Sequence, residues 1–161
     1  MTPRRILVPL SAHDDAEAVL SVVAALARES GAVVRCLRVW PIPETRTAKS
    51  GRVVATVDQE MERLGAQALD DLRRVVAGLR GVAVENVVRF GGAADEILLE
   101  AEAWGADLIA VTQRATWLGR LLEGRTARTV AHEATVPVLL CRPYSEQTFR
   151  LRWATARASQ A

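Results

Sequence analysis

Several residue types are scarce in this sequence, and each scarcity narrows what the protein can be. Lysine occurs once, at Lys49, so arginine supplies all the others of the 21 basic side chains. The formal net charge of +2 is too small to create a field that recruits nucleic acid or an anionic membrane. No apolar run approaches the roughly 20 residues of a membrane span, and the run at residues 6–10 is too short for a secretory signal. We therefore expect a cytoplasmic protein with no membrane partner.

Cysteine and histidine are too few and too scattered for a metal or redox centre. Cys36 and Cys141 lie far apart, each in an apolar run without a neighbouring His or Cys. This pattern predicts two buried thiols in a reducing compartment. His13 and His132 belong to no Ser–His–Asp arrangement, metal-ligand spacing or carboxylate pair. We expect no catalytic residue, no metal site and no enzymatic activity.

What the sequence does contain is a regular alternation of short apolar runs and amphipathic segments. Strands are predicted at residues 4–10, 33–40, 82–89, 107–111 and 136–141. Helices are predicted from a cap at Asp14 to Gly31, from a cap at Thr56 to Gly81, from Gly92 to Gly105, and near residues 117–134. Residues 41–55 are predicted to be a surface loop. Alternating strands and helices predict an α/β fold, a single parallel sheet with helices on both faces.

Four stretches, in their order and spacing, resemble the universal stress protein family. They are Ile-Leu-Val-Pro-Leu-Ser-Ala-His-Asp-Asp from Ile6, Gly-Gly-Ala-Ala-Asp-Glu-Ile-Leu from Gly91, Leu-Gly-Arg-Leu-Leu-Glu-Gly from Leu118, and Val-Pro-Val-Leu-Leu from Val136. The resemblance covers residues 4–142 as one domain and leaves residues 143–161 as a C-terminal tail. It implies a doubly wound five-stranded parallel sheet of order 3-2-1-4-5, of the adenine nucleotide alpha hydrolase-like kind. It also implies a ligand crevice at the carboxyl ends of the first and fourth strands.

The resemblance places a set of candidate residues around this crevice. They are Pro9, Leu10, Ser11, Val39, Val111, Thr112, Arg114, Ala115, Gly124, Arg125 and Thr126. The family's ATP-binding branch carries an acidic residue where this chain has Ser11. It also carries a glycine motif that lets phosphate oxygens approach backbone amides.

The glycine motif is degenerate in this chain. Thr112 and Ala115 stand where the motif has glycine, and the loop before Gly124 is one residue short. Arg125 replaces the motif's final Ser or Thr, with Thr126 one position late. We therefore expect no bound cofactor, ATP included.

Arginines near this loop keep a second interpretation open. Arg114, Arg120, Arg125 and Arg128 can hold phosphate or carboxylate through their paired donors, or they can form a solvated face. If these arginines do hold such a group, the crevice binds an anion, or a nucleotide in a different pose from that of the family's ATP-binding branch.

The last predicted strand and the tail point to self-association. Pro137 removes a ladder donor, so the strand from Val136 to Cys141 is predicted to be an edge strand. Family members commonly dimerise along this strand, which implies a homodimer here. The tail mixes Arg150 and Arg152 with aromatic residues, so it packs on the domain or a partner subunit, stays free, or binds single-stranded nucleic acid.

The sequence thus predicts a universal-stress-type protein that acts as a non-catalytic dimeric interaction or regulatory module in a stress response. Its protein partner is not named by the sequence, and nucleic acid is not the expected partner. The alternative is a nucleotide- or anion-binding regulator with at most very slow ATP hydrolysis.

Overall fold

Five parallel strands form the central sheet of this protein. The computed structural model describes residues 2–11, 16–112 and 119–141, with residues 119–124 described as backbone. The strands are β1 (Arg5–Pro9), β2 (Val33–Trp40), β5 (Ala83–Phe90), β6 (Leu108–Thr112) and β7 (Val138–Cys141). Their spatial order is β5-β2-β1-β6-β7, and every neighbouring pair is parallel. The predicted doubly wound sheet and its strand order are confirmed.

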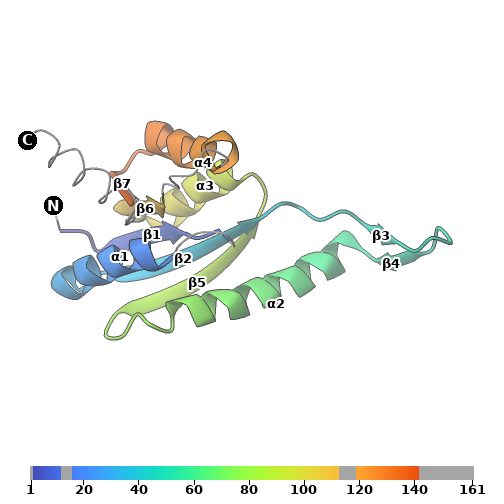
Figure 1. Cartoon of the computed structure of the whole chain (residues 1–161), viewed down its shortest axis with the longest axis horizontal. Coiled ribbons are helices and arrows are strands. Elements are labelled where there is room, and N and C mark those ends of the chain that lie inside the picture. Colours follow the sequence, from blue (N-terminus) through green and yellow to red (C-terminus); the bar gives the residue numbers. More distant parts are fainter. Residues whose placement is uncertain (1, 12–15, 113–118, 142–161) are drawn as a thin grey trace, which may run out of the picture.

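Two helices cover each face of the sheet (Figure 1). The helices α1 (Ala16–Ser30) and α2 (Val57–Val76) pack on one face, and α3 (Ala93–Trp104) and α4 (Gly119–Glu133) pack on the other. Side chains of β1 alternate between the two cores: Ile6 and Val8 belong to the first and Leu7 to the second. All three are fully buried, as a central strand covered on both faces requires.

The helix ends confirm some of the predicted caps and correct one. Thr56 and Gln59 form the predicted capping box, with Gln59 N donating to Thr56 Oγ1 at 3.4 Å and Thr56 N donating to Gln59 Oε1 at 3.1 Å. Gly105 ends α3 in the left-handed conformation, at φ +69. The prediction that α2 runs to Gly81 was wrong, because the helix ends at Val76 and turns follow it. Gly78 weakens the helix there by about 1 kcal/mol relative to alanine. Asp14 lies outside the described residues.

The segment predicted to be a plain surface loop contains a β-hairpin instead. Strands β3 (Arg46–Thr47) and β4 (Val53–Ala55) pair antiparallel. Both strands are too short to produce a recognisable alternation in the sequence, so the prediction missed them. Figure 1 shows the hairpin extending beyond the N-terminal end of α2, away from the sheet.

The predicted edge position of the last strand is confirmed, although the strand is shorter than predicted. β7 begins at Val138 rather than Val136, so Pro137 precedes the strand and contributes only its carbonyl oxygen, which accepts from Ile109 N at 3.0 Å. Leu140 on this strand is 45% exposed.

The predicted division between domain and tail stays a prediction, because residues 142–161 lie outside the described part. Among the helices described, none is both long enough and apolar enough to cross a membrane.

A buried carboxylate fastens α3 to the sheet. Glu100 is 3% exposed and accepts from Arg35 Nη1 at 2.7 Å and from Arg89 Nε at 2.8 Å. Arg35 also lies over the ring of Trp104, with its guanidinium carbon 4.3 Å from the ring centroid. These residues come from β2, β5 and α3, so the cluster joins the helix to two neighbouring strands of the sheet.

Both cysteine thiols are free and buried, as predicted. Burial raises the pKa of Cys36 to about 12 and also raises the pKa of Cys141. The folded state therefore holds the Cys36 proton more tightly than the unfolded state, whose cysteines titrate near 9.0. Stability contributed by this group is present below that pH and is lost as the pH rises toward 12.

We expect both thiols to resist alkylation in the native protein. The thiolate is the reactive form, so the raised pKa lowers the reactive fraction of Cys36 roughly a thousandfold, and burial slows access further. The measurement is iodoacetamide labelling at pH 8 with and without denaturant, using Cys36→Ser and Cys141→Ser to isolate each site. Equal labelling rates in native and denatured protein would contradict the burial of these thiols.

Candidate functional site

The carboxyl ends of β1 and β6 open into a crevice with a cavity volume of about 140 Å³. The chain leaves β1 to cross toward β2 and leaves β6 to cross toward β7, in opposite directions along the sheet. Such a switch point leaves a gap between two neighbouring strand ends, where open parallel sheets bind ligands. The N-terminal turns of α3 and the middle of α4 complete the walls.

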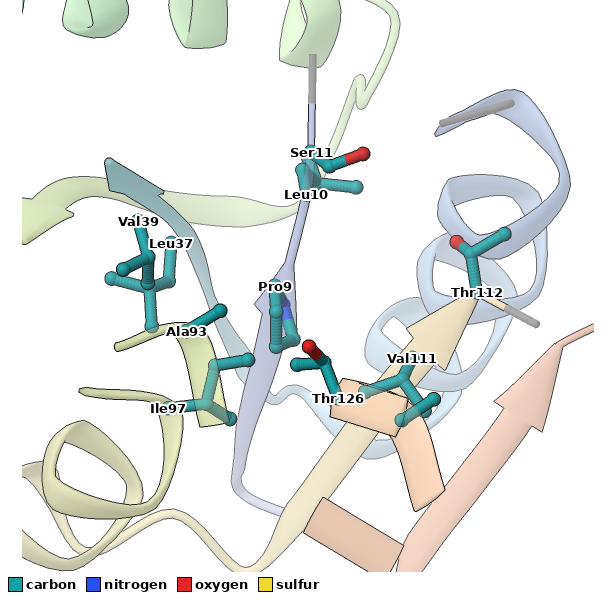
Figure 2. A pocket seen from close by; sticks show the side chains of 11 residues that line it. Pro9, Leu10, Ser11, Leu37, Val39, Ala93, Ile97, Val111, Thr112 and Thr126 are labelled. Carbon is teal, nitrogen blue, oxygen red and sulfur yellow. The ribbon is translucent and has the colours of Figure 1, made fainter. Parts of the chain in front are cut away.

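The crevice gathers most of the predicted site residues that the structure describes. Its lining residues are Pro9, Leu10, Ser11, Leu37, Val39, Ala93, Ile97, Val111, Thr112, Thr126 and Ala127. In Figure 2, Pro9 lies between two groups: Leu37, Val39, Ala93 and Ile97 on one side, and Val111, Thr112 and Thr126 on the other.

Of the four remaining predicted residues, the structure places only Arg125 away from this lining, and the other three are not tested. Arg125 is exposed on α4 and does not border the crevice. Gly124 lies in the part of α4 that is described as backbone. Arg114 and Ala115 lie outside the described residues, so their role stays a prediction.

The polar groups of the described lining are hydroxyls alone. They belong to Ser11, Thr112 and Thr126, and no described lining residue is charged. Thr112 Oγ1 is buried and has no hydrogen-bond partner within the described part of the chain. A buried hydroxyl of this kind can serve a polar group of a ligand. No group of three or more potential metal-ligating side chains occurs among the described residues.

Comparison with known proteins identifies the family. A model described as the universal stress protein family matches residues 2–142. The chain belongs to the universal stress protein family. A curated relative, universal stress protein G of Shigella flexneri, is 30% identical over 119 residues, which are 73% of this chain and 82% of that protein.

Solved universal stress proteins share the fold at lower identity. UspA from Lactobacillus plantarum superposes with a TM-score of 0.66 at 20% identity, covering 86% of this chain and 97% of that one. A universal stress protein from Archaeoglobus fulgidus in complex with dAMP gives a TM-score of 0.55 at 22% identity, covering 88% and 99%.

In this universal stress protein, the N-terminus of α3 is poorly suited to hold a phosphate. Helix N-termini attract anions through their free amides and dipole. Here Asp95 and Glu96 already occupy the first turn of α3. Gly91 has φ +153, and a Cβ there would lie 2.6 Å from Glu96 Oε1, so the glycine makes room for that carboxylate. The positive end of the helix dipole is thus neutralised by the chain's own side chains.

A buried arginine positions the end of β1 beside the crevice. Arg38 is 5% exposed, and its Nε donates to the carbonyl oxygen of Leu10 at 3.1 Å. Arg38 was not among the predicted site residues, because an arginine in a strand is ordinarily placed on a solvent face. Arg38 lies two positions after the buried Cys36 and therefore on the same face of β2.

Four residues of the lining itself were also missed. Leu37 lies two positions before Val39 and therefore on the same face of β2, a signal that the strand alternation offered. Ala93 and Ile97 begin the helix after β5, whose carboxyl end opens at the same edge of the sheet. Ala127 follows Thr126 on α4. Apolar residues of this kind are indistinguishable from core residues until the helices are placed.

Proposed function

We propose that this universal stress protein acts as a non-catalytic dimeric interaction or regulatory module in a cytoplasmic stress response, with a crevice that does not hold ATP. The observation that supports this most directly is the absence of any charged side chain among the described lining residues. A triphosphate needs cations, or glycine-exposed amides, to offset its charge. Thr112 places a side chain at the rim where the family's nucleotide-binding motif has glycine, and Asp95 and Glu96 repel anions at the start of α3.

The absence of catalysis is proposed from the chemistry of the same lining. Hydroxyls are weak nucleophiles unless a base activates them. No His, Asp, Glu, Lys or Cys belongs to the described lining, so Thr112 and Thr126 have no base among the described lining residues.

The second candidate is a regulator that binds a nucleotide with little phosphate charge. Thr112 Oγ1, which is buried and has no partner among the described residues, supports it, because the crevice then has a polar group for a ligand amid apolar walls suited to a base. The Archaeoglobus fulgidus protein in complex with dAMP has the same fold.

We expect titration calorimetry to detect no micromolar binding of Mg-ATP. Binding of dAMP in the absence of Mg-ATP binding would favour the second candidate. Ala93→Trp should fill the crevice, while Ala103→Trp, on the exposed side of the same helix, is the matched control. Micromolar Mg-ATP binding that Ala93→Trp removes and Ala103→Trp retains would refute the leading proposal.

The dimer is proposed to form along β7. This strand ends the sheet, and no described strand pairs with its outer edge. An open edge invites a second strand, and the exposed Leu140 adds an apolar contact to such a pairing. The protein partner, which is not identified, would then bind to this symmetric dimer.

A further inference from the structure

The β3–β4 hairpin is an exposed apolar and cationic projection. We call residues 42–55 the arm. Its exposed aliphatic side chains are Ile42, Val53 and Val54, at 63%, 54% and 62% exposure. Its basic side chains are Arg46, Lys49 and Arg52, all exposed, against one acidic side chain, Glu44. This combination is typical of a surface that binds a partner.

The arm has little to hold it in isolation. A two-stranded hairpin is marginally stable in water. Val53 and Val54 are consecutive, so they point to opposite faces and cannot both be buried against one surface of the same domain. Arg46 ties the arm to α2 through Glu60, with its Nη1 3.8 Å from a carboxylate oxygen. Glu60 is itself held by Arg63 at 2.6 Å, and this hydrogen bond lowers the pKa of Glu60.

A groove of complementary character lies between α3 and the end of α4. We call it the α3–α4 groove, and its cavity volume is about 550 Å³. Its apolar lining includes Leu98, Leu99, Ala106, Ile109 and Val136, and Leu99 is 59% exposed. Three carboxylates, those of Asp95, Glu102 and Glu133, complete the lining, and none of the described lining residues is basic.

The arm and the groove match in both properties but cannot meet within one chain. The arm carries three basic and three aliphatic exposed side chains, and the lining of the groove carries three carboxylates among apolar residues. Figure 1 shows the arm pointing away from α3 and α4, at the far end of the molecule. We propose that the arm of one copy docks in the α3–α4 groove of a second copy. This contact is separate from pairing along β7, so it enlarges the assembly beyond that dimer.

Charge reversal tests the contact. Lys49→Glu with Arg52→Glu reverses the arm, and Glu102→Lys with Glu133→Lys reverses the groove; both acidic residues lie near helix C-termini, where lysine is tolerated. In sedimentation velocity at low salt, each reversed protein should self-associate about tenfold more weakly than the native chain. An equal mixture of the two should regain association, because the acidic arm of one meets the basic groove of the other. A chain carrying both reversals should behave like the mixture.

The controls separate this contact from others. Arg80→Glu with Arg128→Glu makes the same change in net charge as the arm reversal, at exposed positions elsewhere, and should leave association unchanged. Val53→Ser with Val54→Ser should weaken association without altering charge. The contact should persist in Leu140→Arg, so failure of the β7 dimer does not hide it.

Three results would overturn the proposal. The first is a native chain that never exceeds the β7 dimer or that ignores both reversals. The second is a change in association that appears only when the chain is ended after Pro143, which would make the tail the occupant of the groove. The third is an arm reversal that abolishes binding to phosphatidylserine vesicles while self-association stays unchanged.

Discussion

Replacing Glu100 with alanine is expected to lower the free energy of unfolding by about 3 kcal/mol. The carboxylate is 3% exposed and joins Arg35 and Arg89. Without the Glu100 carboxylate, Arg35 keeps a charge that has lost its ion-pair partner on α3. Its side chain is only 19% exposed, so water cannot fully solvate that charge. Arg89 is 47% exposed and can turn toward solvent, which places the expected loss at the lower end for a buried ion pair.

Chemical denaturation monitored by tryptophan fluorescence measures this loss. Glu62→Ala removes a carboxylate from an exposed position on α2 and should change stability by less than about 0.5 kcal/mol. Glu100→Gln keeps the size and part of the hydrogen bonding, so it should fall between the two. If Glu100→Ala were as stable as Glu62→Ala, the cluster would not hold α3 on the sheet.

Replacing Leu140 with arginine is expected to break the proposed pairing along β7, with the dissociation constant of that contact raised about a hundredfold. Leu140 is 45% exposed on the edge strand. In a dimer paired along β7, arginine at this position would place two like charges near the two-fold axis and strip them of water. The fold should survive, because position 140 is exposed in the single chain.

Gel filtration with light scattering measures the effect across a range of concentrations. Val22→Arg places the same charge at a similarly exposed position, 42%, on α1, and should keep the β7 pairing of the native chain. A protein that carries Leu140→Arg together with Lys49→Glu and Arg52→Glu, and that stays dimeric at every concentration, would rule out the β7 interface. Loss of the dimer in Val22→Arg as well would point to a general effect of added charge.

The local features of this fold could be predicted from the sequence because they depend on near neighbours in the chain. The capping box of Thr56 and Gln59 joins residues three positions apart. The left-handed turn at Gly105 depends on the backbone freedom of one residue. The apolar run at residues 6–10 showed a strand covered on both faces, and alternation with helices then led to a parallel sheet.

The candidate site could be predicted only in part. The strand-end residues Ser11, Val39 and Thr112 were placed through the family resemblance, and they do line the crevice. Ala93 and Ile97 were not, because a small or aliphatic residue at a helix start has the same pattern whether it faces a cavity or a core.

The arrangement of buried charge was decided by tertiary structure alone. Arg38 and Glu100 carry the residue types that sequence patterns assign to the surface, yet both are buried. Their partners lie on other elements, Leu10 for Arg38 and Arg35 and Arg89 for Glu100. The alternation of strands and helices in this universal stress protein, by contrast, was determined by the periodicity of its sequence. Which polar groups it buries was decided by packing, because a charge is stable inside a protein only where the fold brings its partner to it.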